Sequence, residues 1–586
     1  MSNTGKAIDF NLLSRVLSFT RPYRKLLYSA IFLSVILSFV SPVRPLLINY
    51  AVDNYIIESP NISFLWNMCV LLVGLLFVEA IVQFIYIYVA TLIGQHVIKD
   101  MRSKVYNHIL KLKMSFFDRT PIGALVTRTV SDIETIADIF SQGLFVIIGE
   151  LLKLSVIICM MFYTDWKLAI MSMISIPILL VATAWFKKNI KRSFQDVRSQ
   201  VSKINTFVQE HITGMNVVQI FNREVAEYHK FKKINDQHLS ANLKSIFYYS
   251  VFFPVVEILS ALSIGIIIWY GGVAILEQKD VTLGELIAFI LYIYMMFRPI
   301  RQLADRFNVL QMGIVGSERV FKILDTDEFI EDQGEVNRNK ITGNITFQNV
   351  KFAYKSDQWV FKDISLNIPS GKQTAIVGDT GSGKTSIINL LCRFYEYQFG
   401  SIFIDEIDIR NYSLYNLRSH ISIIQQDVHL FSSSIIDNVR LFDPDISRNS
   451  IIQASKDIGI DDFITKLPGG YDYIVGERGV TLSTGQRQLI SFLRIYLRNP
   501  SVLILDEATS SIDTHTEGLL QNALDKISAG KTTIVIAHRL STIVSSDNII
   551  VLEKGELIEQ GSHTDLMSIN GKYAQMYKTQ LSSNEK

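Results

Sequence analysis

The sequence is poor in charged residues. Asp, Glu, Lys and Arg make up only 19% of its 586 residues, whereas a soluble domain of ordinary composition carries about 25%. Only 12 Pro and 31 Gly occur, too few for a collagen-like or a proline-rich disordered chain. Three widely separated cysteines, Cys69, Cys159 and Cys392, predict neither a disulfide set nor a metal cluster. The formal net charge of +2 gives no basic field that would point to nucleic acid as a partner.

The charge deficit is concentrated in the first half of the chain. The runs Leu26–Val43, Ile62–Val78, Leu168–Phe186 and Ile258–Leu276 contain no Asp, Glu, Lys or Arg, and a bilayer span needs about 17–25 mostly apolar residues. Two further apolar stretches carry a few charges. We therefore predict six membrane spans, at about 26–50, 62–94, 139–164, 166–187, 247–276 and 281–305.

The distribution of Lys and Arg predicts the orientation of these spans. The N-terminus and two long connections, 95–138 and 187–246, are rich in both residues, whereas the loop 53–63 has neither. Because positive residues favour the cytoplasmic side, we expect the N-terminus, both connections and the second half of the chain to be cytoplasmic. Polar bends near 115–123 and 213–224 interrupt the connections, and we interpret them as contact points for the second half.

Charged residues inside membrane spans are costly and are often functional. Glu150 and Lys153 are three residues apart, so the expected arrangement is an ion pair within one helix. Glu79 and Glu257 have no such local partner; lining of a polar cavity, helix–helix contact or a position at the membrane edge each fits them. The full set of polar candidates is Glu79, Gln83, Gln142, Glu150, Lys153, Glu257 and Arg298.

The second half, from about residue 341, has the composition of a soluble α/β domain. A short apolar strand at 373–377 precedes a glycine-rich loop and a helical run, which is the context that a phosphate-binding loop requires. Its backbone N–H groups would converge on phosphate, while Lys384 reaches the β- and γ-phosphates and Thr385 ligates Mg²⁺. The predicted ATP-binding residues of this segment are Gly378, Asp379, Thr380, Gly381, Ser382, Gly383, Lys384, Thr385 and Ser386.

A second apolar strand, at 502–506, ends in two carboxylates, Asp506 and Glu507. In nucleotide hydrolases with such a loop, an aspartate at this place holds Mg²⁺. A glutamate that follows it can orient or deprotonate the attacking water. The sequence therefore predicts ATP and Mg²⁺ as cofactors, Asp506 as a magnesium ligand and Glu507 as a catalytic residue.

Between these elements lies a segment that resembles the Leu-Ser-Gly-Gly-Gln signature of the ATP-binding-cassette superfamily. With six preceding spans, nearly the whole chain resembles a half-transporter of the exporter fold. The resemblance implies a multidomain chain: an all-α transmembrane domain at 1–325, a linker at 326–340 and an α/β P-loop nucleotide-binding domain at 341–586. The segment consists of Leu482, Ser483, Thr484, Gly485 and Gln486.

The resemblance also assigns roles to single residues. It implies that Tyr354 stacks on adenine and that Gln426 senses Mg²⁺ as a ligand and catalytic residue. It places His538 near the γ-phosphate as a catalytic switch. Ser511 and Asp513 match the loop that crosses to a partner subunit.

One nucleotide-binding domain cannot complete an ATP site, because the resemblance implies that a second half-transporter subunit presents its signature to the γ-phosphate. Thr484 stands where the family has glycine, and a β-branched side chain would crowd backbone close to nucleotide. This departure favours a heterodimer, while a homodimer that tolerates threonine stays open. The bends at 115–123 and 213–224 resemble the two coupling helices of the family.

The implied function is that of an ATP-hydrolysing exporter of the bacterial inner membrane. It would move a small amphipathic or lipid-like substrate, such as a lipid, drug or xenobiotic, by alternating access within the surrounding membrane lipids. Two alternatives on the same fold stay open: an importer of the siderophore type and a nucleotide-gated channel. An intact Glu507 favours turnover over gating.

Overall fold

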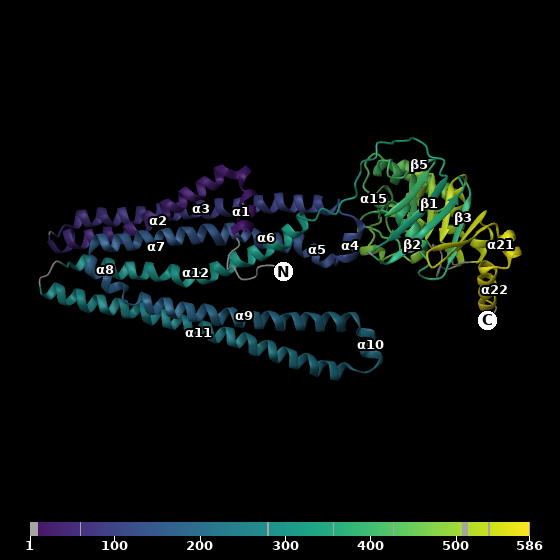
Figure 1. The fold of residues 1–586 in the computed structure, drawn as a ribbon. Coiled ribbons are helices and arrows are strands. Elements are labelled where there is room, and N and C mark those ends of the chain that lie inside the picture. Colours follow the sequence, from purple (N-terminus) through teal and green to yellow (C-terminus); the bar gives the residue numbers. More distant parts are fainter. Residues whose placement is uncertain are drawn as a thin grey trace. The chain divides into compact units, whose positions relative to one another are not determined.

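The computed structural model consists of two compact units (Figure 1). Unit 1 comprises Met1–Leu110 and Pro121–Asp327, and unit 2 comprises Lys111–Thr120 and Glu328–Lys586. The residues that the structure describes are 10–58, 60–277, 281–355, 357–425, 427–506, 514–536 and 540–584.

Unit 1 is built from helices, several of them much longer than a bilayer is thick. Short 3-10 or π-helical turns at Arg21–Tyr23, Asp53–Glu58 and Ile139–Leu144 join some of them. The helices are α1 (Phe10–Ser18), α2 (Arg24–Val52), α3 (Ile62–Ile109), α5 (Ile122–Thr129), α6 (Ser131–Asp138), α7 (Phe145–Thr164), α8 (Trp166–Met173), α9 (Ile176–Thr213), α10 (Met215–Ile220), α11 (Glu224–Leu276) and α12 (Leu283–Leu324).

Five helical segments among the described residues are long and apolar enough to cross a membrane. They coincide with the first five predicted spans: Arg21–Glu58, Ile62–Ile109, Ile122–Thr164, Trp166–Thr213 and Glu224–Leu276. The sixth predicted span lies in α12, a continuous helix of 42 residues. Charged residues such as Glu285, Arg298 and Arg306 lower its apolar character, so this span stays a prediction.

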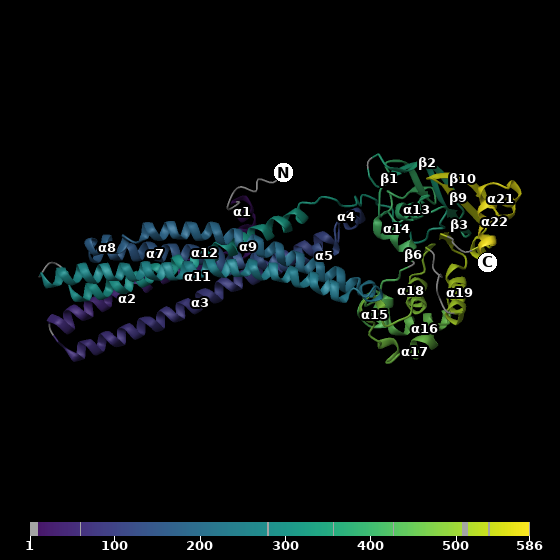
Figure 2. The ribbon, with the colours of Figure 1, turned by 90° about the horizontal axis from the view of Figure 1, so that it is seen from below.

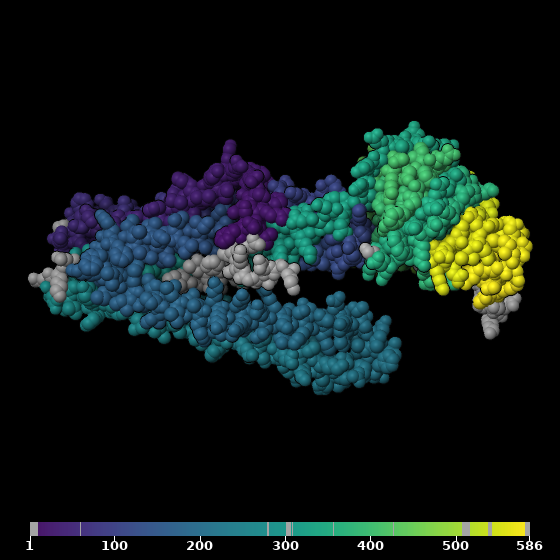
Figure 3. Space-filling model, in the orientation of Figure 1, coloured from purple at the N-terminus to yellow at the C-terminus, as the bar shows by residue number. Residues whose placement is uncertain are grey.

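Helices α9 and α11 form a long antiparallel pair joined by α10 (Figures 1 and 2). Small side chains let the two backbones approach: the hydroxyls of Ser193 and Ser245 lie 2.7 Å apart across the pair. Toward α10 the pair stands apart from the other helices of unit 1 (Figure 3). Helix α10 has no buried residue, and Ile220 and Phe221 at its end are largely exposed.

Unit 2 contains two sheets and a set of short helices. The strands are β1 (Ile345–Ala353), β2 (Trp359–Ile368), β3 (Gln373–Gly378), β4 (Phe399–Ile404), β5 (Ile407–Asp408), β6 (Ile421–Ile424), β7 (Val502–Asp506), β8 (Thr532–Ile536), β9 (Asn548–Glu553) and β10 (Glu556–Gly561). The helices are α4 (Met114–Arg119), α13 (Lys384–Leu391), α14 (Leu414–His420), α15 (Ile435–Arg440), α16 (Arg448–Ile458), α17 (Asp461–Thr465), α18 (Thr484–Arg498), α19 (Thr514–Ser528), α20 (Leu540–Val544), α21 (His563–Ile569) and α22 (Lys572–Asn584), with 3-10 turns at Gly470–Asp472 and Glu477–Gly479.

The larger sheet has the strand order β10-β9-β3-β8-β7-β6 and is parallel except for β10. The smaller sheet, β2-β1-β4-β5, is antiparallel. Strands β7 and β8 are apolar and almost wholly buried, as expected for strands covered on both faces. One apolar core lies between the sheets around α13. A second lies against helices α15 to α18. Figure 2 shows these four helices grouped together beside the sheets.

Asp405, in the turn between β4 and β5, holds the segment that leads into β1. Its carboxylate accepts hydrogen bonds from the backbone N–H groups of Thr342, Gly343 and Asn344, over 2.6 to 3.0 Å, and from the Thr342 hydroxyl. Burial alone would raise the pKa of Asp405. The hydrogen bonds from Thr342, Asn344 and Gly343 outweigh it and hold the pKa below its usual value.

We predict that Asp405→Asn destabilises unit 2 by about 1–2 kcal/mol, because a charged acceptor of several hydrogen bonds is lost. Thermal unfolding should shift down by about 2–4 °C per kcal/mol for a domain of this size. The contribution of a carboxylate with a lowered pKa is complete above the unfolded value of about 3.9 and is lost only as the pH falls through the folded-state pKa. The loss should therefore be equal at pH 5 and pH 8. Asp363→Asn, at an exposed position of β2, is the control and should change the melting temperature little.

Candidate functional site

The glycine-rich loop connects β3 to α13, and two of its positions have room for backbone only. Gly383 has a φ of +105°, and a Cβ there would lie 2.5 Å from Cε1 of Phe361. A Cβ on Gly378 would lie 2.2 Å from the carbonyl oxygen of Leu552. These two positions therefore require glycine, and the loop turns directly into the N-terminus of α13, the end of a helix that attracts anions.

Lys384 is folded back against this loop. Its side chain is buried, and Nζ donates hydrogen bonds to the carbonyl oxygens of Gly378 at 2.8 Å and Asp379 at 3.0 Å. The hydroxyl of Ser382 is also buried, without a hydrogen-bond partner in the described part of the chain. A buried cation and an unsatisfied hydroxyl at one loop form a cradle that fits a phosphate group.

Tyr354 lies beside the same loop, next to the first turns of α13. Its hydroxyl is 3.0 Å from the hydroxyl of Ser386 and accepts a hydrogen bond of 2.9 Å from Asn389. The ring is partly exposed and meets the ring of Tyr395 edge-on, with centroids 4.8 Å apart. An aromatic face next to a phosphate loop is suited to stacking on a base.

Asp506 ends β7, and β8 runs between β7 and β3 in parallel register. The carboxyl ends of these strands, and of β6 beside them, therefore form one sheet edge, at which the glycine-rich loop also lies. Parallel α/β sheets bind their ligands at this edge. The other predicted residues that follow these strands lie outside the described residues: Gln426, Glu507, Ser511, Asp513 and His538.

The signature segment forms the N-terminus of α18. Ser483 caps the helix: its hydroxyl accepts from the N–H of Gln486 at 3.2 Å, and the Gln486 side chain accepts from the N–H of Ser483 at 2.9 Å. Thr484 is the first helical residue, and its hydroxyl accepts a hydrogen bond from Arg487. Ser483 and Thr484 are exposed, whereas Leu482 is buried. The helix start therefore accommodates threonine, with the capping box intact.

Helix α4 belongs to unit 2 and binds close to Tyr354. The Tyr395 hydroxyl donates a hydrogen bond to the carboxylate of Asp118, and Arg119 forms an ion pair with Glu328. Burial first, and then the hydrogen bond to Asp118, raises the pKa of Tyr395. Asp118 lies in the bend 115–123 that the sequence singled out, but its partner Tyr395 was not predicted, since the two residues are 277 positions apart and Tyr395 belongs to no motif.

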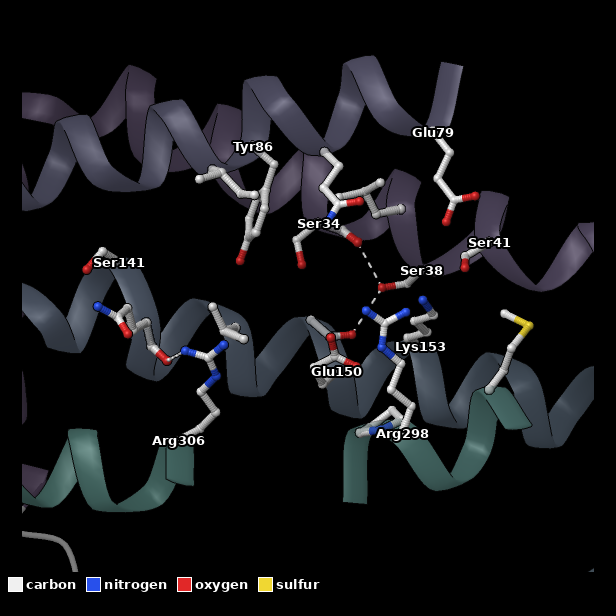
Figure 4. A pocket seen from close by; sticks show the side chains of 18 of the residues that line it. Ser34, Ser38, Ser41, Glu79, Tyr86, Ser141, Glu150, Lys153, Arg298 and Arg306 are labelled. Atoms are coloured by element: carbon white, nitrogen blue, oxygen red, sulfur yellow. Dashed lines mark hydrogen bonds between the residues drawn. The ribbon is translucent and has the colours of Figure 1, made fainter. Parts of the chain in front are cut away.

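In unit 1, most of the predicted intramembrane polar residues line one cavity of about 600 Å³ (Figure 4). Glu79 forms an ion pair with Arg44, which sequence reasoning did not select, although it is the first charge after an apolar run. Glu150 and Lys153, both of which the structure describes, do not form the ion pair that their spacing predicted. Glu257 does not line this cavity. The predicted polar residues that line it are Glu79, Gln83, Gln142, Glu150, Lys153 and Arg298.

The two units match two separate family models. Residues 27–300 match the ABC transporter transmembrane region, and residues 361–510 match the ABC transporter model. An uncharacterized ABC transporter ATP-binding protein of Bacillus subtilis is 37% identical over 99% of this chain and 96% of its own length. The chain belongs to the ABC transporters. This confirms the family that the signature segment predicted.

Further relatives show which branch of the ABC transporters this chain belongs to. An ATP-dependent lipid A-core flippase of Syntrophus aciditrophicus is 37% identical over 83% of this chain and 81% of its own length. A probable multidrug resistance ABC transporter ATP-binding/permease protein of Bacillus subtilis is 37% identical over 89% of this chain and 78% of its own length. The chain is an exporter-type half-transporter: a multi-pass membrane protein whose ATPase domain binds ATP and drives transport, and which requires a dimer partner. The predicted fold class, a helical transmembrane region followed by an α/β nucleotide-binding domain, is confirmed.

We predict that Gly383→Ala abolishes high-affinity ATP binding by this ABC transporter, because the new methyl group meets the ring of Phe361 and the backbone sits in a region that alanine avoids. Equilibrium binding of radiolabelled ATP should weaken at least about tenfold. Gly459→Ala is a matched control: Gly459 also has a positive φ, of +84°, but open space around its Cβ position. Unchanged affinity in Gly383→Ala would mean that the loop rearranges before nucleotide binds.

Proposed function

We propose that this half-transporter exports an amphipathic or lipid-like substrate across the bacterial inner membrane by alternating access. The observation that carries the proposal is the division of the ATP-site elements in unit 2. The phosphate cradle around Lys384 and the exposed signature at Ser483 are complementary halves, and a second subunit supplies the missing half to each. Nucleotide that binds the closed pair more tightly than the open one then drives the conformational change.

The donor set at the sheet edge fits Mg²⁺. This ion prefers oxygen ligands and is held by one or two carboxylates together with substrate phosphates. Thr385 offers an exposed hydroxyl on the first turn of α13, and Asp506 offers a carboxylate at the end of β7; we assign both as ligands, with Gln426 as the third. Mg²⁺ would offset the negative charge of the β- and γ-phosphates.

Hydrolysis is assigned to the residues that follow β7 and β8. Glu507 accepts the proton of the attacking water, and His538 contacts the γ-phosphate that leaves. Tyr354 stacks on adenine, and residues Gly378 to Ser386 surround the phosphates. Ser511 and Asp513 reach the partner subunit. The neighbouring parallel strands β3, β8 and β7 support this assignment, because their carboxyl ends, with Asp506 at the end of β7, meet at one sheet edge.

The signature residues Leu482 to Gln486 face the partner's ATP site in this proposal. Thr484 favours a heterodimer, in which the altered signature faces a weaker site of the partner while this chain supplies Lys384, Asp506 and Glu507 to the active one. The intact capping box of α18 also fits a homodimer, so the two assemblies need a direct test.

Two coupling helices connect nucleotide chemistry with the membrane in this proposal. Helix α4, which overlaps the predicted segment 115–123, accepts a hydrogen bond from Tyr395 of its own chain through Asp118. Helix α10, within 213–224, exposes Val217, Ile220 and Phe221, an apolar surface suited to the partner's nucleotide-binding domain. With six spans in residues 1–325 and a linker at 326–340, both helices and the domain at 341–586 lie in the cytoplasm.

We predict that Glu507→Gln retains ATP binding and loses steady-state hydrolysis by a factor of about 100 or more, the range expected for a general base. The measurement is ATPase activity in lipid nanodiscs together with equilibrium ATP binding. Glu556→Gln, at an exposed position of β10, should keep wild-type turnover. Near-normal hydrolysis by Glu507→Gln would contradict the assignment of the base.

We predict that Thr484→Gly changes turnover less than twofold in a heterodimer whose altered signature faces a weak site, because that site contributes little hydrolysis. In a homodimer both sites use this signature, and turnover should change several-fold. The chain should be purified alone, its mass measured by light scattering, and its ATPase activity compared with that of Thr484→Gly. An active dimer from the single chain would contradict the heterodimer.

A further inference from the structure

The cavity of unit 1 is enclosed by α2, α3, α12 and the segment Ile122–Thr164. Figure 4 shows Glu79 and Tyr86 projecting from α3 toward Glu150, Lys153 and Arg298 on the opposite helices. Four cations line it against two carboxylates, which leaves the lining with a net charge of +2 when all of them are ionised. The ionised side chains are Arg44, Lys153, Arg298 and Arg306, with Glu79 and Glu150.

Hydrogen-bond donors in this cavity are only partly satisfied. Arg44 pairs with Glu79, but its Nε is buried without a hydrogen bond in the part of the chain that the structure describes. The hydroxyl of Tyr86 lies near Ser34. It is also buried without a hydrogen bond among the described residues. Lys153 and Arg298 have no ion pair with any described residue. Arg298 is exposed and Lys153 is half-buried, so the cost of a buried donor without an acceptor applies to Arg44 Nε and the Tyr86 hydroxyl. These donors, together with the positive charge of Lys153 and Arg298, favour a ligand that brings acceptor oxygens and negative charge.

The remaining lining of the cavity is apolar. Leu37, Ile87, Val146 and Met295 contribute side chains to the same wall as the charged groups. Ligand sites commonly combine such an apolar lining with a few polar groups that fix orientation. A ligand that satisfies both parts has an anionic head and an apolar tail.

We propose that this cavity binds the anionic oxygen head group of an amphiphile, such as a phosphate, sulfate or carboxylate, and that such amphiphiles are the substrate class of this transporter. Arg298, Lys153 and Tyr86 are the contacting donors. The carboxylate of Glu79 keeps Arg44 in place. The inference rests on the proposed function, since it names the substrate of the same transport cycle.

Three single-chain detergents with the same tail allow binding of an anionic, a cationic and a neutral head group to be compared. Dodecyl phosphate, dodecyltrimethylammonium and dodecyl maltoside should be compared below their micellar concentrations, on the full chain in phosphatidylcholine nanodiscs, with empty nanodiscs as background. We expect dodecyl phosphate to bind at least tenfold more tightly than the other two. Inorganic phosphate is a fourth probe, and we expect it to bind far more weakly than dodecyl phosphate because it lacks the tail.

Variants of the donors locate the site. Arg298→Gln combined with Lys153→Gln should weaken dodecyl phosphate at least tenfold, since two charged hydrogen-bond donors are lost. Arg298→Lys should remain within a few-fold of wild type, because it keeps the charge. Lys167→Gln removes a cation of α8 outside the cavity and should have no effect. If the double variant does not fold, Tyr86→Phe, which removes one hydroxyl, should weaken binding about threefold or more.

Tighter binding of dodecyltrimethylammonium than of dodecyl phosphate would overturn the proposal, as would unchanged affinity in the Arg298 and Lys153 double variant. Equal affinity for inorganic phosphate would overturn the assignment to an amphiphile. Basal ATPase activity is measured on the same samples, with Glu507→Gln as the inactive reference. It separates a failure of the proposed function from a failure of the proposed substrate class. A chain that hydrolyses ATP but prefers cationic or neutral amphiphiles keeps the proposed function and loses only the substrate class.

Discussion

The nucleotide-binding unit depends on one geometric constraint: where the buried strand β3 turns into α13, two positions must be occupied by backbone alone. Gly383 and Gly378 meet it because neither position has room for a Cβ atom. The parallel sheet then determines what else is near the phosphate, since β7 and β8 end at the same edge as β3. Lys384 already lies against the loop carbonyl groups, so phosphate oxygens compete with carbonyl oxygens for its ammonium group.

Helix α18, which begins at the signature segment, differs from the glycine-rich loop because its N-terminus is exposed. Its first residues, Ser483 and Thr484, are exposed. A helix N-terminus attracts anions, and in the proposed function a second subunit would provide one as bound nucleotide. This asymmetry within one domain is the physical reason for a dimer, and it does not depend on whether the two chains are identical.

Local sequence spacing was enough to predict the glycine-rich loop between a strand and a helix, the strand that ends in Asp506 and five of the long apolar helices, because each follows from neighbouring residues. The sixth span was harder, since α12 mixes apolar residues with Arg298 and Arg306. Long-range pairs were not accessible: Arg44 and Glu79 are 35 residues apart, and an ion pair between Glu150 and Lys153 was expected instead. A spacing of three residues on a helix permits such an ion pair. It does not determine whether the two side chains meet each other or project into a cavity.

Mixed charge in the cavity satisfies two opposing demands of transport. A purely cationic lining would be costly inside a membrane and would hold an anion too tightly to release it. Glu79 and Glu150 reduce both effects, because they offset part of the positive charge and lie close enough to Lys153 to attract it. An anionic head group then binds against a net charge of only +2, and a rearrangement that brings the carboxylates closer to the cations weakens its site. ATP needs to supply only the free-energy difference between head-group binding in the two conformations of the transporter. A partly neutralised cavity keeps this difference small.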